Sequence, residues 1–579
     1  MAIGLSALAG AWWFSISAHP RAMLEAGAPM LFILSLVGQP IPLPKLQLTR
    51  LLAFGNLAIF ASLALGVGRV DLTNVKDFKI SNAPTLQSVL TNDTPSDGHP
   101  DVLLISVDTL RADAILNADV PTPNIDKLRA VSHVSDYGVA PSPVTLPSHL
   151  SMVTGELPTS HGSYTNLGKL PNHLPTLGEA FKQAGYNTVA VASNSLLNAY
   201  TGFDRGFDLL LNIAGGGEHI ESHTEVGKSG RRLTWYSAFL PNLMAKKLTM
   251  ALIVRRYKMK SFSDDVSDST AEKVDQLSLA YFDELYARQQ PFFYFLHYMD
   301  PHVPYSASPE FAGQLSASHP LPDRYDNYAQ GSLELCKQVL RDQINGIDDS
   351  QLAFDNLRAR YHEELLKIDN SIGRILERLA KSQRPTVILF TSDHGELFGE
   401  NDHVLHGGNV YAANIRVPFM LSLPGQDTQH SFSTRPALSD VPLTLLNAAG
   451  FAVNEFGVGR NLLDNNLGDD YLVAVSDNRF SVEYAGYKII FEWTSAEGSE
   501  SDFVPFALFA TASGVAEENN LLGQAAYKQV QDNLTEVATR LQSKSVKRGM
   551  REFDDAERSR LNELGYAFDD EGNSIESDH

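Results

Sequence analysis

The chain has 579 residues, of which 43% are hydrophobic and 20% charged, a composition typical of a folded protein. Its 46 Lys and Arg against 68 Asp and Glu give a formal net charge of −22, which argues against a nucleic-acid partner because phosphate would be repelled. Cys336 is the single cysteine, so an intrachain disulfide and a cysteine metal cluster are excluded. Any metal must be held by carboxylates, imidazoles and hydroxyls.

Residues 1–70 carry almost no charge and predict a transmembrane region of two or three helices. For the first segment, a cleaved signal peptide is the alternative. Lys45 and Arg50 share one loop against Arg21 in the other, which weakly favours a cytoplasmic position for residues 39–50. We therefore expect anchoring in the lipid bilayer of the inner (cytoplasmic) membrane, with the remainder extracytoplasmic or periplasmic. The three apolar segments are 1–18, 23–38 and 51–68.

Beyond the anchor, strand-like apolar runs alternate with helical patterns, which is typical of an α/β domain with a mostly parallel sheet covered by helices. The expected strands are Val102–Val107, Thr188–Ala192, Phe292–Leu296 and Thr386–Phe390. The expected helices are Thr176–Ala184, which opens with a capping box, and Tyr361–Lys381.

The remaining patterns divide the chain further. Strand-like pieces at Tyr471–Val475 and Tyr487–Phe491, followed by a helix over Ala525–Gln542, predict a small C-terminal α+β subdomain. The second of two insertions is acidic and is expected to be irregular. The predicted parts are a linker at 71–100, a catalytic domain at 101–464 with insertions at 215–263 and 315–356, the subdomain at 465–568, and an acidic tail at 569–579.

Acidic residues follow two of the predicted strands. Asp108 comes directly after the first, and Asp393, His394 and Gly395 follow the fourth. Because ligands of open α/β sheets bind at the carboxyl ends of the strands, these side chains are candidates for one divalent-cation site. A lone Asp after a strand can instead be a turn or N-cap residue, and for Asp108 taken alone this structural role is favoured.

A third element is the segment around Thr145. Pro147 fits the first turn of a helix that runs on to Gly155, and Thr145 is expected just ahead of it. The free N–H groups and dipole at that end stabilise anions and would lower the cost of an alkoxide. The alternative is that Thr145 or Ser148 merely caps the helix.

Together these elements resemble the sulfatase family of the alkaline-phosphatase superfamily. The family signature, Cys or Ser-x-Pro-Ser-Arg followed by a helix and Thr-Gly, is similar to Thr145–His149 with Thr154–Gly155. The resemblance spans about residues 101–525 in the family's order. Other matching stretches are Val107–Asp113, Thr122–Asp126, His161–Gly162, His297–Tyr305, Ser392–Glu396, His406–Gly407, Arg416–Pro418, Gly486–Lys488 and Glu518–Leu521.

The chain also departs from the family pattern. Formylglycine-dependent sulfatases oxidise the Cys or Ser, but Thr145 cannot yield that aldehyde because its β-carbon carries a methyl group. His149 replaces the signature Arg, Thr109 replaces the second Asp of the usual pair, and His406 stands for the usual Lys. An unmodified Thr resembles phosphoryl-handling relatives such as phosphoethanolamine transferases and nucleotide phosphodiesterases, which implies a covalent phospho-Thr intermediate and favours phosphate over sulfate.

The resemblance implies specific roles. One divalent metal, with zinc or manganese favoured and calcium as an alternative, is expected to bind Asp108, Thr145, Asp393 and His394. Thr145 is the expected nucleophile and His149 its helper, while His302 and His406 are expected to contact ester oxygens or protonate the leaving group. A second metal would instead use His297, Asp300, His302 and His406, although Asp300 is expected to order the Pro301 turn. Structural roles are expected for Arg111 and Asp113 and are favoured for His161.

Three functions follow as hypotheses. The first is a hydrolase or transferase that acts on a phosphate or sulfate ester of a cell-envelope component through Thr145. The second is a true sulfatase that uses unmodified Thr145. The third is a catalytically inactive sulfatase-like binding module, against which the set Asp108, Thr145, Asp393, His394 and His406 argues.

Overall fold

The computed structural model describes residues 98–213, 219–221, 270–467, 471–494, 503–511 and 517–542, all within one compact unit that spans 79–579. The predicted anchor at 1–70, most of the first insertion and the acidic tail lie outside the described residues. In the described ranges, no helix has both the length and the apolarity needed to cross a bilayer.

Within the described part of the chain, the central sheet has nine strands in the order β11-β2-β10-β7-β1-β6-β3-β4-β5. The neighbours β7-β1-β6-β3-β4 are parallel, whereas β10 runs antiparallel to both β7 and β2. The sheet is therefore mostly parallel, as the sequence predicts. The strands are β1 Asp101–Val107, β2 His133–Val139, β3 Asn187–Ala192, β4 Leu209–Asn212, β5 His219–Glu221, β6 Phe292–Tyr298, β7 Thr386–Ser392, β10 Arg416–Ser422 and β11 His430–Ser431.

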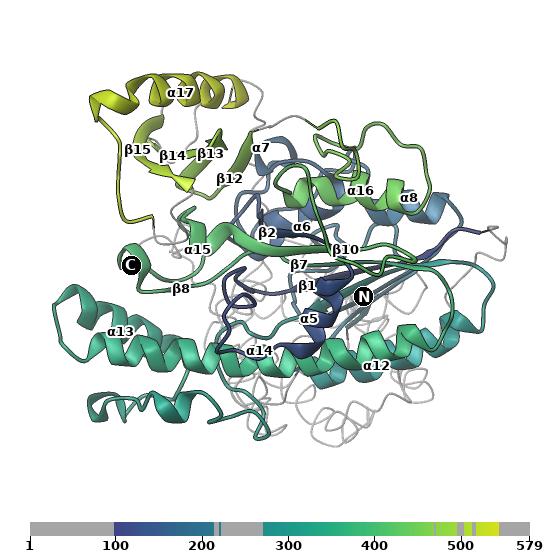
Figure 1. The fold of residues 1–579 in the computed structure, drawn as a ribbon, viewed down its shortest axis with the longest axis horizontal. Coiled ribbons are helices and arrows are strands. Elements are labelled where there is room, and N and C mark those ends of the chain that lie inside the picture. Colours follow the sequence, from purple (N-terminus) through teal and green to yellow (C-terminus); the bar gives the residue numbers. More distant parts are fainter. Residues whose placement is uncertain are drawn as a thin grey trace, which may run out of the picture. The chain divides into compact units, whose positions relative to one another are not determined.

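Helices cover both faces of this sheet (Figure 1). One layer holds α5, α12 and α14, and the other holds α6, α8 and α16. The α-helices are α5 Pro123–Ala130, α6 Thr145–Thr154, α7 Pro158–His161, α8 Leu177–Gln183, α12 Thr270–Tyr286, α13 Leu333–Ile344, α14 Ser350–Ala380, α15 Ala412–Ile415, α16 Val441–Ala448 and α17 Lys528–Gln542. Short 3₁₀ helices are Ser316–Ser318, Asp323–Tyr325, Glu400–Asp402, Leu438–Asp440 and Ala525–Tyr527.

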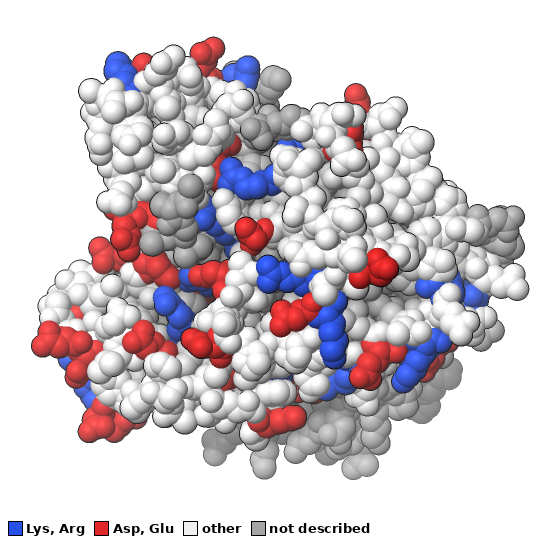
Figure 2. Space-filling model, in the orientation of Figure 1, with Lys and Arg blue, Asp and Glu red and all other residues white. Residues whose placement is uncertain are grey.

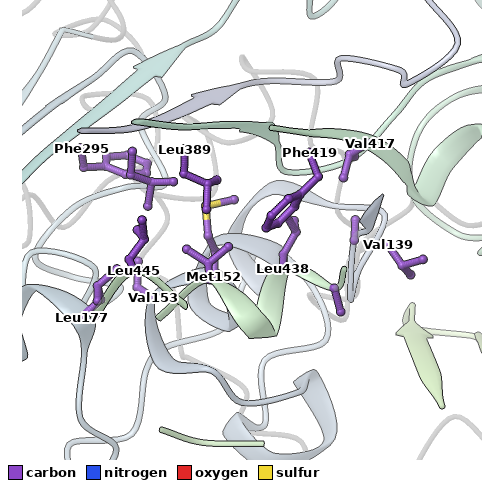
Figure 3. Packing of buried hydrophobic residues seen from close by; sticks show 14 of the residues in the cluster. Val139, Met152, Val153, Leu177, Phe295, Leu389, Val417, Phe419, Leu438 and Leu445 are labelled. Atoms are coloured by element: carbon purple, nitrogen blue, oxygen red, sulfur yellow. The ribbon is translucent and has the colours of Figure 1, made fainter. Parts of the chain in front are cut away.

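The apolar contacts between α6 and the sheet place the N-terminus of α6 at the strand ends. Met152 and Val153 face Phe295, Leu389 and Phe419 across the layer, as Figure 3 shows, and all five are buried. Full burial of such a side chain stabilises the fold by about 1.5–3 kcal/mol. The far end of α6 stops where the backbone turns left-handed, and a side chain there would collide with a neighbouring carbonyl. That residue is Gly155, with φ +72° and an added Cβ only 2.4 Å from the Phe456 oxygen.

All four predicted strands are present, as β1, β3, β6 and β7, and Thr176 caps α8 with the expected capping box. The prediction of an irregular second insertion was wrong, because residues 315–356 contain α13 and the first turns of α14. In α13 the buried Leu335, Val339 and Leu340 share one face between charged residues, and this amphipathic spacing stabilises a helix despite the acidic composition.

The C-terminal subdomain is a four-stranded antiparallel sheet, β12-β13-β14-β15, beside α17. Its α+β nature agrees with the prediction, which found two of these strands and missed β13 and β15. Ala474, Ile490 and Ala507 belong to the same buried cluster as the main sheet, so the subdomain packs on the catalytic domain. Its strands are β12 Leu472–Val475, β13 Arg479–Tyr484, β14 Tyr487–Trp493 and β15 Phe503–Ala510, and a separate hairpin pairs β8 Leu397–Phe398 with β9 Val404–Leu405.

Charges of both signs are interspersed on the surface. Figure 2 shows small groups of Lys and Arg between Asp and Glu on the face that it draws. Some of these charges pair across elements, as Arg378 on α14 does with the exposed Asp283 on α12 at 2.6 Å. Exposed pairs of this kind typically contribute less than about 1 kcal/mol, so burial and not surface charge holds the layers together.

Candidate active site

The register of two parallel strands brings the predicted acidic residues together. Val107 at the end of β1 lies opposite Ser392 at the end of β7, so the next residues, Asp108 and Asp393, leave the sheet at the same level. His394 follows immediately, and all three side chains are fully buried. The sheet thereby delivers two carboxylates and an imidazole to one point, as expected from strand-end geometry.

The turn after Asp108 is strained. Thr109 adopts φ +56°, a left-handed conformation that is an outlier for a β-branched residue. Its backbone N–H donates to Asp393 Oδ1 at 3.3 Å, and the next N–H, of Leu110, donates to Ser392 Oγ at 2.9 Å. These bonds hold the turn against the end of β7, and strain of this kind typically persists at functional sites.

Thr145 is the first residue of α6 and is fully buried. The residue at the N-cap position is Val144, which makes no side-chain cap hydrogen bond, and the Thr145 hydroxyl faces His394. Ser148 also caps nothing, because its hydroxyl donates to the Asp393 carbonyl at 2.6 Å. The capping alternative for Thr145 and Ser148 was therefore wrong.

Three donor atoms lie within 4 Å of His394 Nε2. Thr145 Oγ1 lies 3.4 Å from His394 Nε2. That same nitrogen lies 3.4 Å from Asp393 Oδ2 and 3.8 Å from Asp108 Oδ1. Ligands of a tetrahedral cation with bonds of about 2.0–2.2 Å are separated by about 3.3–3.6 Å, so two of these spacings fit a divalent ion such as zinc and the third is slightly longer.

The hydrogen bonds around these donors also fit a cation. Asp108 Oδ1 and Asp393 Oδ2 are buried and have no hydrogen-bond partner. The other carboxylate oxygens are partnered, Asp108 Oδ2 by Asn194 at 2.9 Å and Asp393 Oδ1 by the His394 N–H at 2.9 Å. His394 Nδ1 donates to the Gly395 carbonyl at 3.0 Å, which leaves Nε2 as the ligand atom. Each ligand is thus oriented by a second contact, and its free atom points to the common centre.

The pKa shifts of the site residues also favour a bound cation. Burial, and then the negative charge of Asp108, raise the pKa of Asp393 well above its usual range. Burial lowers the pKa of His394 to about 3, so its imidazole is neutral at physiological pH, the state that binds metals. Because the ligand atoms of Asp108, Asp393 and His394 lie within 4.8 Å of one another, a cation would relieve the repulsion between the two carboxylates.

His149, predicted to assist the nucleophile, contacts the backbone of Thr145 and not its hydroxyl. His149 Nδ1 lies 2.8 Å from the Thr145 carbonyl, so this nitrogen carries the proton, and Nε2 accepts from the Ser106 hydroxyl at 3.0 Å. Burial lowers the pKa of His149 to about 3, and the ring is neutral. The residue at the signature Arg position therefore connects β1 to the first turn of α6 without adding a charge.

His302 and His406 border the metal-ligand set. The His406 ring lies 4.5 Å from that of His394 and 4.9 Å from that of His302, between centroids. His302 Nδ1 donates to the Val303 carbonyl at 2.7 Å, which leaves a buried Nε2 without a partner. Burial lowers the pKa values of both rings, to about 4 for His406.

The four residues considered for a second metal do not share one centre. Asp300 Oδ1 forms an ion pair with Lys367 at 2.8 Å, an arrangement that matches the expected role in ordering the turn before Pro301. His297 lies behind Asp108, with Nε2 3.4 Å from Asp108 Oδ2, and belongs to a buried group with His149 and Asp393. Since both nitrogens of His149 already have partners, this second group has no free His149 atom to offer a metal.

Two asparagines at the site were missed from the sequence. Asn194 follows β3 and supports Asp108, and the strand-end rule applied to β3 would have found it. Asn166 accepts from the Leu146 N–H at 2.9 Å, and its buried Nδ2 has no partner beside the nucleophile. It lies in a loop without a strand before it, so the sequence offered no signal.

The residues expected to be structural are held by ordinary contacts. Arg111 pairs with Asp113 at 2.7 Å and with Glu400 at 2.8 Å. His161 Nε2 lies 3.1 Å from the Ser151 hydroxyl on α6, and the ring is fully buried. These side chains stabilise the turns around the site and lie outside the donor set.

A mostly parallel α/β sheet with a strand-end cation site and a helix-borne hydroxyl defines an ester hydrolase of the alkaline-phosphatase superfamily. The sulfatase family model matches residues 100–451, more than half of the chain. The chain belongs to the sulfatase family.

Several relatives are similar to a large part of this chain. The choline-sulfatase of Rhizobium meliloti is 25% identical over 375 residues, which cover 62% of this chain and 69% of the relative. The arylsulfatase of Clostridium perfringens is 24% identical over 468 residues, 76% of this chain and 93% of the relative. A multifunctional alkaline phosphatase superfamily protein of Trinickia caryophylli, PehA, is 25% identical over 398 residues, 62% and 76%.

Solved structures share the fold. The phosphonate monoester hydrolase of Agrobacterium radiobacter superposes with a TM-score of 0.52 at 17% identity, covering 82% of this chain and 99% of the other. A protein in complex with D-glucosamine-2-N,6-O-disulfate superposes with a TM-score of 0.55 at 16% identity, covering 77% and 98%. These likenesses support the sulfatase-like α/β architecture.

Proposed function

We propose that this protein is a metal-dependent hydrolase or transferase of phosphate esters that uses Thr145 as a covalent nucleophile. The observation that carries the proposal is the unmodified Thr145 hydroxyl, which lies 3.4 Å from a candidate ligand atom and belongs to the four-donor set. When bound, a divalent cation lowers the pKa of such a hydroxyl and neutralises the oxygens of the ester.

The reaction would proceed in two displacements. Thr145 Oγ1, whose proton would pass to water on cation binding, attacks phosphorus and forms a phospho-Thr, while the bond from phosphorus to the leaving oxygen breaks. The leaving oxygen would take a proton from the imidazolium form of His406, and the neutral His406 would recover it from the attacking water or alcohol in the second step. Water or an acceptor alcohol then attacks the phospho-Thr and regenerates the hydroxyl. Asn166 Nδ2 is buried and unpartnered and, as an N–H donor, is suited to contact a non-bridging oxygen.

Phosphate is the preferred centre because Thr145 cannot follow the sulfatase route. That route releases sulfate by elimination from a hydrated aldehyde, which a β-methyl group prevents. A phospho-Thr is instead cleaved by in-line attack at phosphorus. The relative named as a multifunctional alkaline phosphatase superfamily protein, and the phosphonate monoester hydrolase that shares the fold, are consistent with a phosphorus substrate.

The second candidate is a true sulfatase that uses unmodified Thr145. It is favoured by the names of the choline-sulfatase and arylsulfatase relatives. Both candidates share the metal site, so they differ only in the atom that Thr145 attacks. The third hypothesis, an inactive binding module, is disfavoured because the donor set is complete.

We further propose that residues 1–70 anchor the protein in the inner membrane and that the catalytic domain acts outside the cytoplasm on an envelope component. The three apolar segments and the distribution of Lys45, Arg50 and Arg21 support this topology. A periplasmic reporter fused after Gly68 should be active; activity of a cytoplasmic reporter at that position would reverse the orientation.

The substrate assignment is tested with matched esters. Purified protein, loaded in turn with zinc, manganese or calcium, is assayed on p-nitrophenyl phosphate, p-nitrophenyl phenylphosphonate and p-nitrophenyl sulfate. We expect kcat/KM for a phosphorus ester to exceed that for the sulfate by about tenfold or more, a gap of about 1.4 kcal/mol in transition-state stabilisation. Faster sulfate turnover would favour the sulfatase candidate, and no turnover of any ester would favour the binding module.

A further inference from the structure

Glu396 is a buried carboxylate beside the site that the proposed reaction leaves without a role. It lies two residues after His394, and its side chain is fully buried. One carboxylate oxygen, Oε1, lies 3.0 Å from His406 Nδ1. The other, Oε2, accepts from the Tyr305 hydroxyl at 3.1 Å. Burial of a carboxylate costs free energy unless the group is hydrogen-bonded, and both oxygens of Glu396 have a partner.

The backbone at Glu396 is held in place. Its carbonyl accepts from Arg111 Nη1 at 2.9 Å. The preceding Gly395 donates to the Asn414 carbonyl at 2.8 Å, and an added Cβ there would lie 2.0 Å from the Ala413 oxygen. The carboxylate therefore sits on a rigid segment and cannot swing away from His406.

The contact between Glu396 and His406 orients the His406 ring. Burial raises the pKa of Glu396 to about 7, and the neighbouring imidazoles His302 and His394 oppose that shift. In its ionised form the carboxylate can only accept, so the 3.0 Å contact with Nδ1 fixes the His406 ring and leaves Nε2 for the reacting ester. In the protonated ring, the same carboxylate stabilises the positive charge while Nε2–H is given to the leaving oxygen. The Tyr305 hydroxyl occupies Oε2, so Oε1 is the atom directed at the ring.

We infer that Glu396, itself fixed by Tyr305, is the positioning residue that orients His406 for proton donation to the leaving group. This inference rests on the proposed function of His406. The hydrogen bonds of Glu396 go to His406, Tyr305 and Arg111 and to none of the four donor atoms, so an effect on the reaction would pass through the imidazole. The dependence on His406 gives the inference a signature that a merely structural carboxylate would lack.

The test compares two esters with the same phosphoryl group, p-nitrophenyl phosphate and ethyl phosphate. p-Nitrophenolate departs without a proton, whereas ethoxide requires one. Loss of general-acid catalysis typically costs about 10²-fold or more. Glu396→Gln and His406→Ala are each expected to lower kcat on ethyl phosphate by about 10²-fold and kcat on p-nitrophenyl phosphate by less than about fivefold.

Two further variants sharpen the result. The double variant Glu396→Gln/His406→Ala should be no slower on ethyl phosphate than His406→Ala alone, because groups that act as a unit are not additive. Tyr305→Phe removes only the hydroxyl and should give a smaller loss, about three- to tenfold, on ethyl phosphate only. It also keeps the inference testable if Glu396→Gln does not fold.

The matched control is Glu363→Gln on α14. This Glu is equally buried but accepts only from the backbone N–H groups of Leu315 and Ser316. It should leave the ratio of the two rates unchanged.

The outcomes distinguish failure of the proposed role of His406 from failure of the inference about Glu396. If His406→Ala slows both esters equally, the proposed role of His406 fails and the inference falls with it. If His406→Ala is selective for ethyl phosphate but Glu396→Gln and Tyr305→Phe are not, the proposed function stands and the inference is overturned. Multiplicative losses in the double variant would likewise show that Glu396 acts independently of His406.

Discussion

Two clusters of charge lie on either side of the turn after β1, and they differ in how their charges are neutralised. In the first, Arg111 bonds Asp113 and Glu400, and no side-chain nitrogen or oxygen of these three residues is buried without a partner. In the second, Asp108 Oδ1 and Asp393 Oδ2 are buried without a hydrogen-bond partner, and the basic groups near them are imidazoles. A structural cluster supplies its own counter-charge, whereas the second needs a cation from outside the chain.

The Arg111 cluster and the Asp108 cluster lie in neighbouring parts of one loop system, and we expect the first to serve stability and the second to serve function. Changes in the Arg111 cluster should alter the free energy of unfolding and leave metal content intact. Changes in the Asp108 cluster should alter metal content and turnover. The predictions below test whether the two effects can be separated in this way.

The largest effect is expected for Thr145→Ala. Loss of a covalent nucleophile typically lowers kcat by about 10³-fold or more, far more than the ~1 kcal/mol of a helix cap. Thr145→Ser should retain part of the activity, because a primary hydroxyl can attack the same centre. Thr154→Ala is the matched control, since its hydroxyl donates to the Leu150 carbonyl at the far end of α6. A Thr145→Ala enzyme within about tenfold of wild type would remove the nucleophile from the account.

Asp393→Asn and His394→Ala are expected to lose most of the bound cation and to lower activity by about 10²-fold or more. In wild type a cation bound at 100 times its Kd should stabilise the folded state by about 2.7 kcal/mol, and chelation should remove that gain. Elemental analysis and thermal unfolding with and without chelator measure both quantities. A fully metallated, active His394→Ala protein would place the cation elsewhere.

Glu400→Gln should have the reverse pattern. It removes the carboxylate between Arg111 and Arg358, and we expect a loss of about 2 kcal/mol in the free energy of unfolding. Metal content and kcat should stay within about twofold of wild type, as for a charge-assisted bond outside the site. Urea unfolding and elemental analysis decide the outcome, and a large loss of metal in this variant would mean that the two clusters are coupled.

The smallest effect concerns acid stability. Burial lowers the pKa of His161 from 6.5 to about 3, so the unfolded state takes up this proton first as the pH falls. The neutral buried ring contributes its full stabilisation above about pH 6.5. This contribution is lost as the pH falls towards the folded-state pKa of about 3, and the loss is about 1.4 kcal/mol at pH 5.5. His161→Gln should flatten the difference in unfolding free energy between pH 7.5 and 5.5 by about this amount. An unchanged difference would mean that the buried ring is protonated.

Much of the fold could be predicted because buried parallel strands are continuous apolar runs. β1, β3, β6 and β7 follow that rule, and their ends located Asp108 and Asp393. The start of α14 was not found in this way, because composition assigns residues 350–356 to the acidic insertion that precedes them. Composition alone does not separate these two cases, whereas the spacing of buried residues does.

The identities of the site residues were more predictable than their contacts. A strand register fixes where a backbone ends, so Asp393 and His394 could be placed from the sequence. The direction of the His149 ring depends on how α6 is rotated against the sheet, and the ring bonds the Thr145 carbonyl and Ser106, not the hydroxyl. Such rotations follow from tertiary packing, which a single sequence does not specify.

Native mass spectrometry of the protein with and without p-nitrophenyl phosphate tests the central claim most directly, because one spectrum reports the cation and the covalent intermediate. The account predicts one bound divalent cation and, with ester, an adduct of about 80 Da on the intact protein, which digestion should place on the peptide that contains Thr145. Because phosphoryl and sulfuryl groups are nearly isobaric, radiophosphorus confirms the element. Thr145→Ala should show neither adduct nor turnover. An adduct on another residue, or full turnover by metal-free protein, would contradict the account.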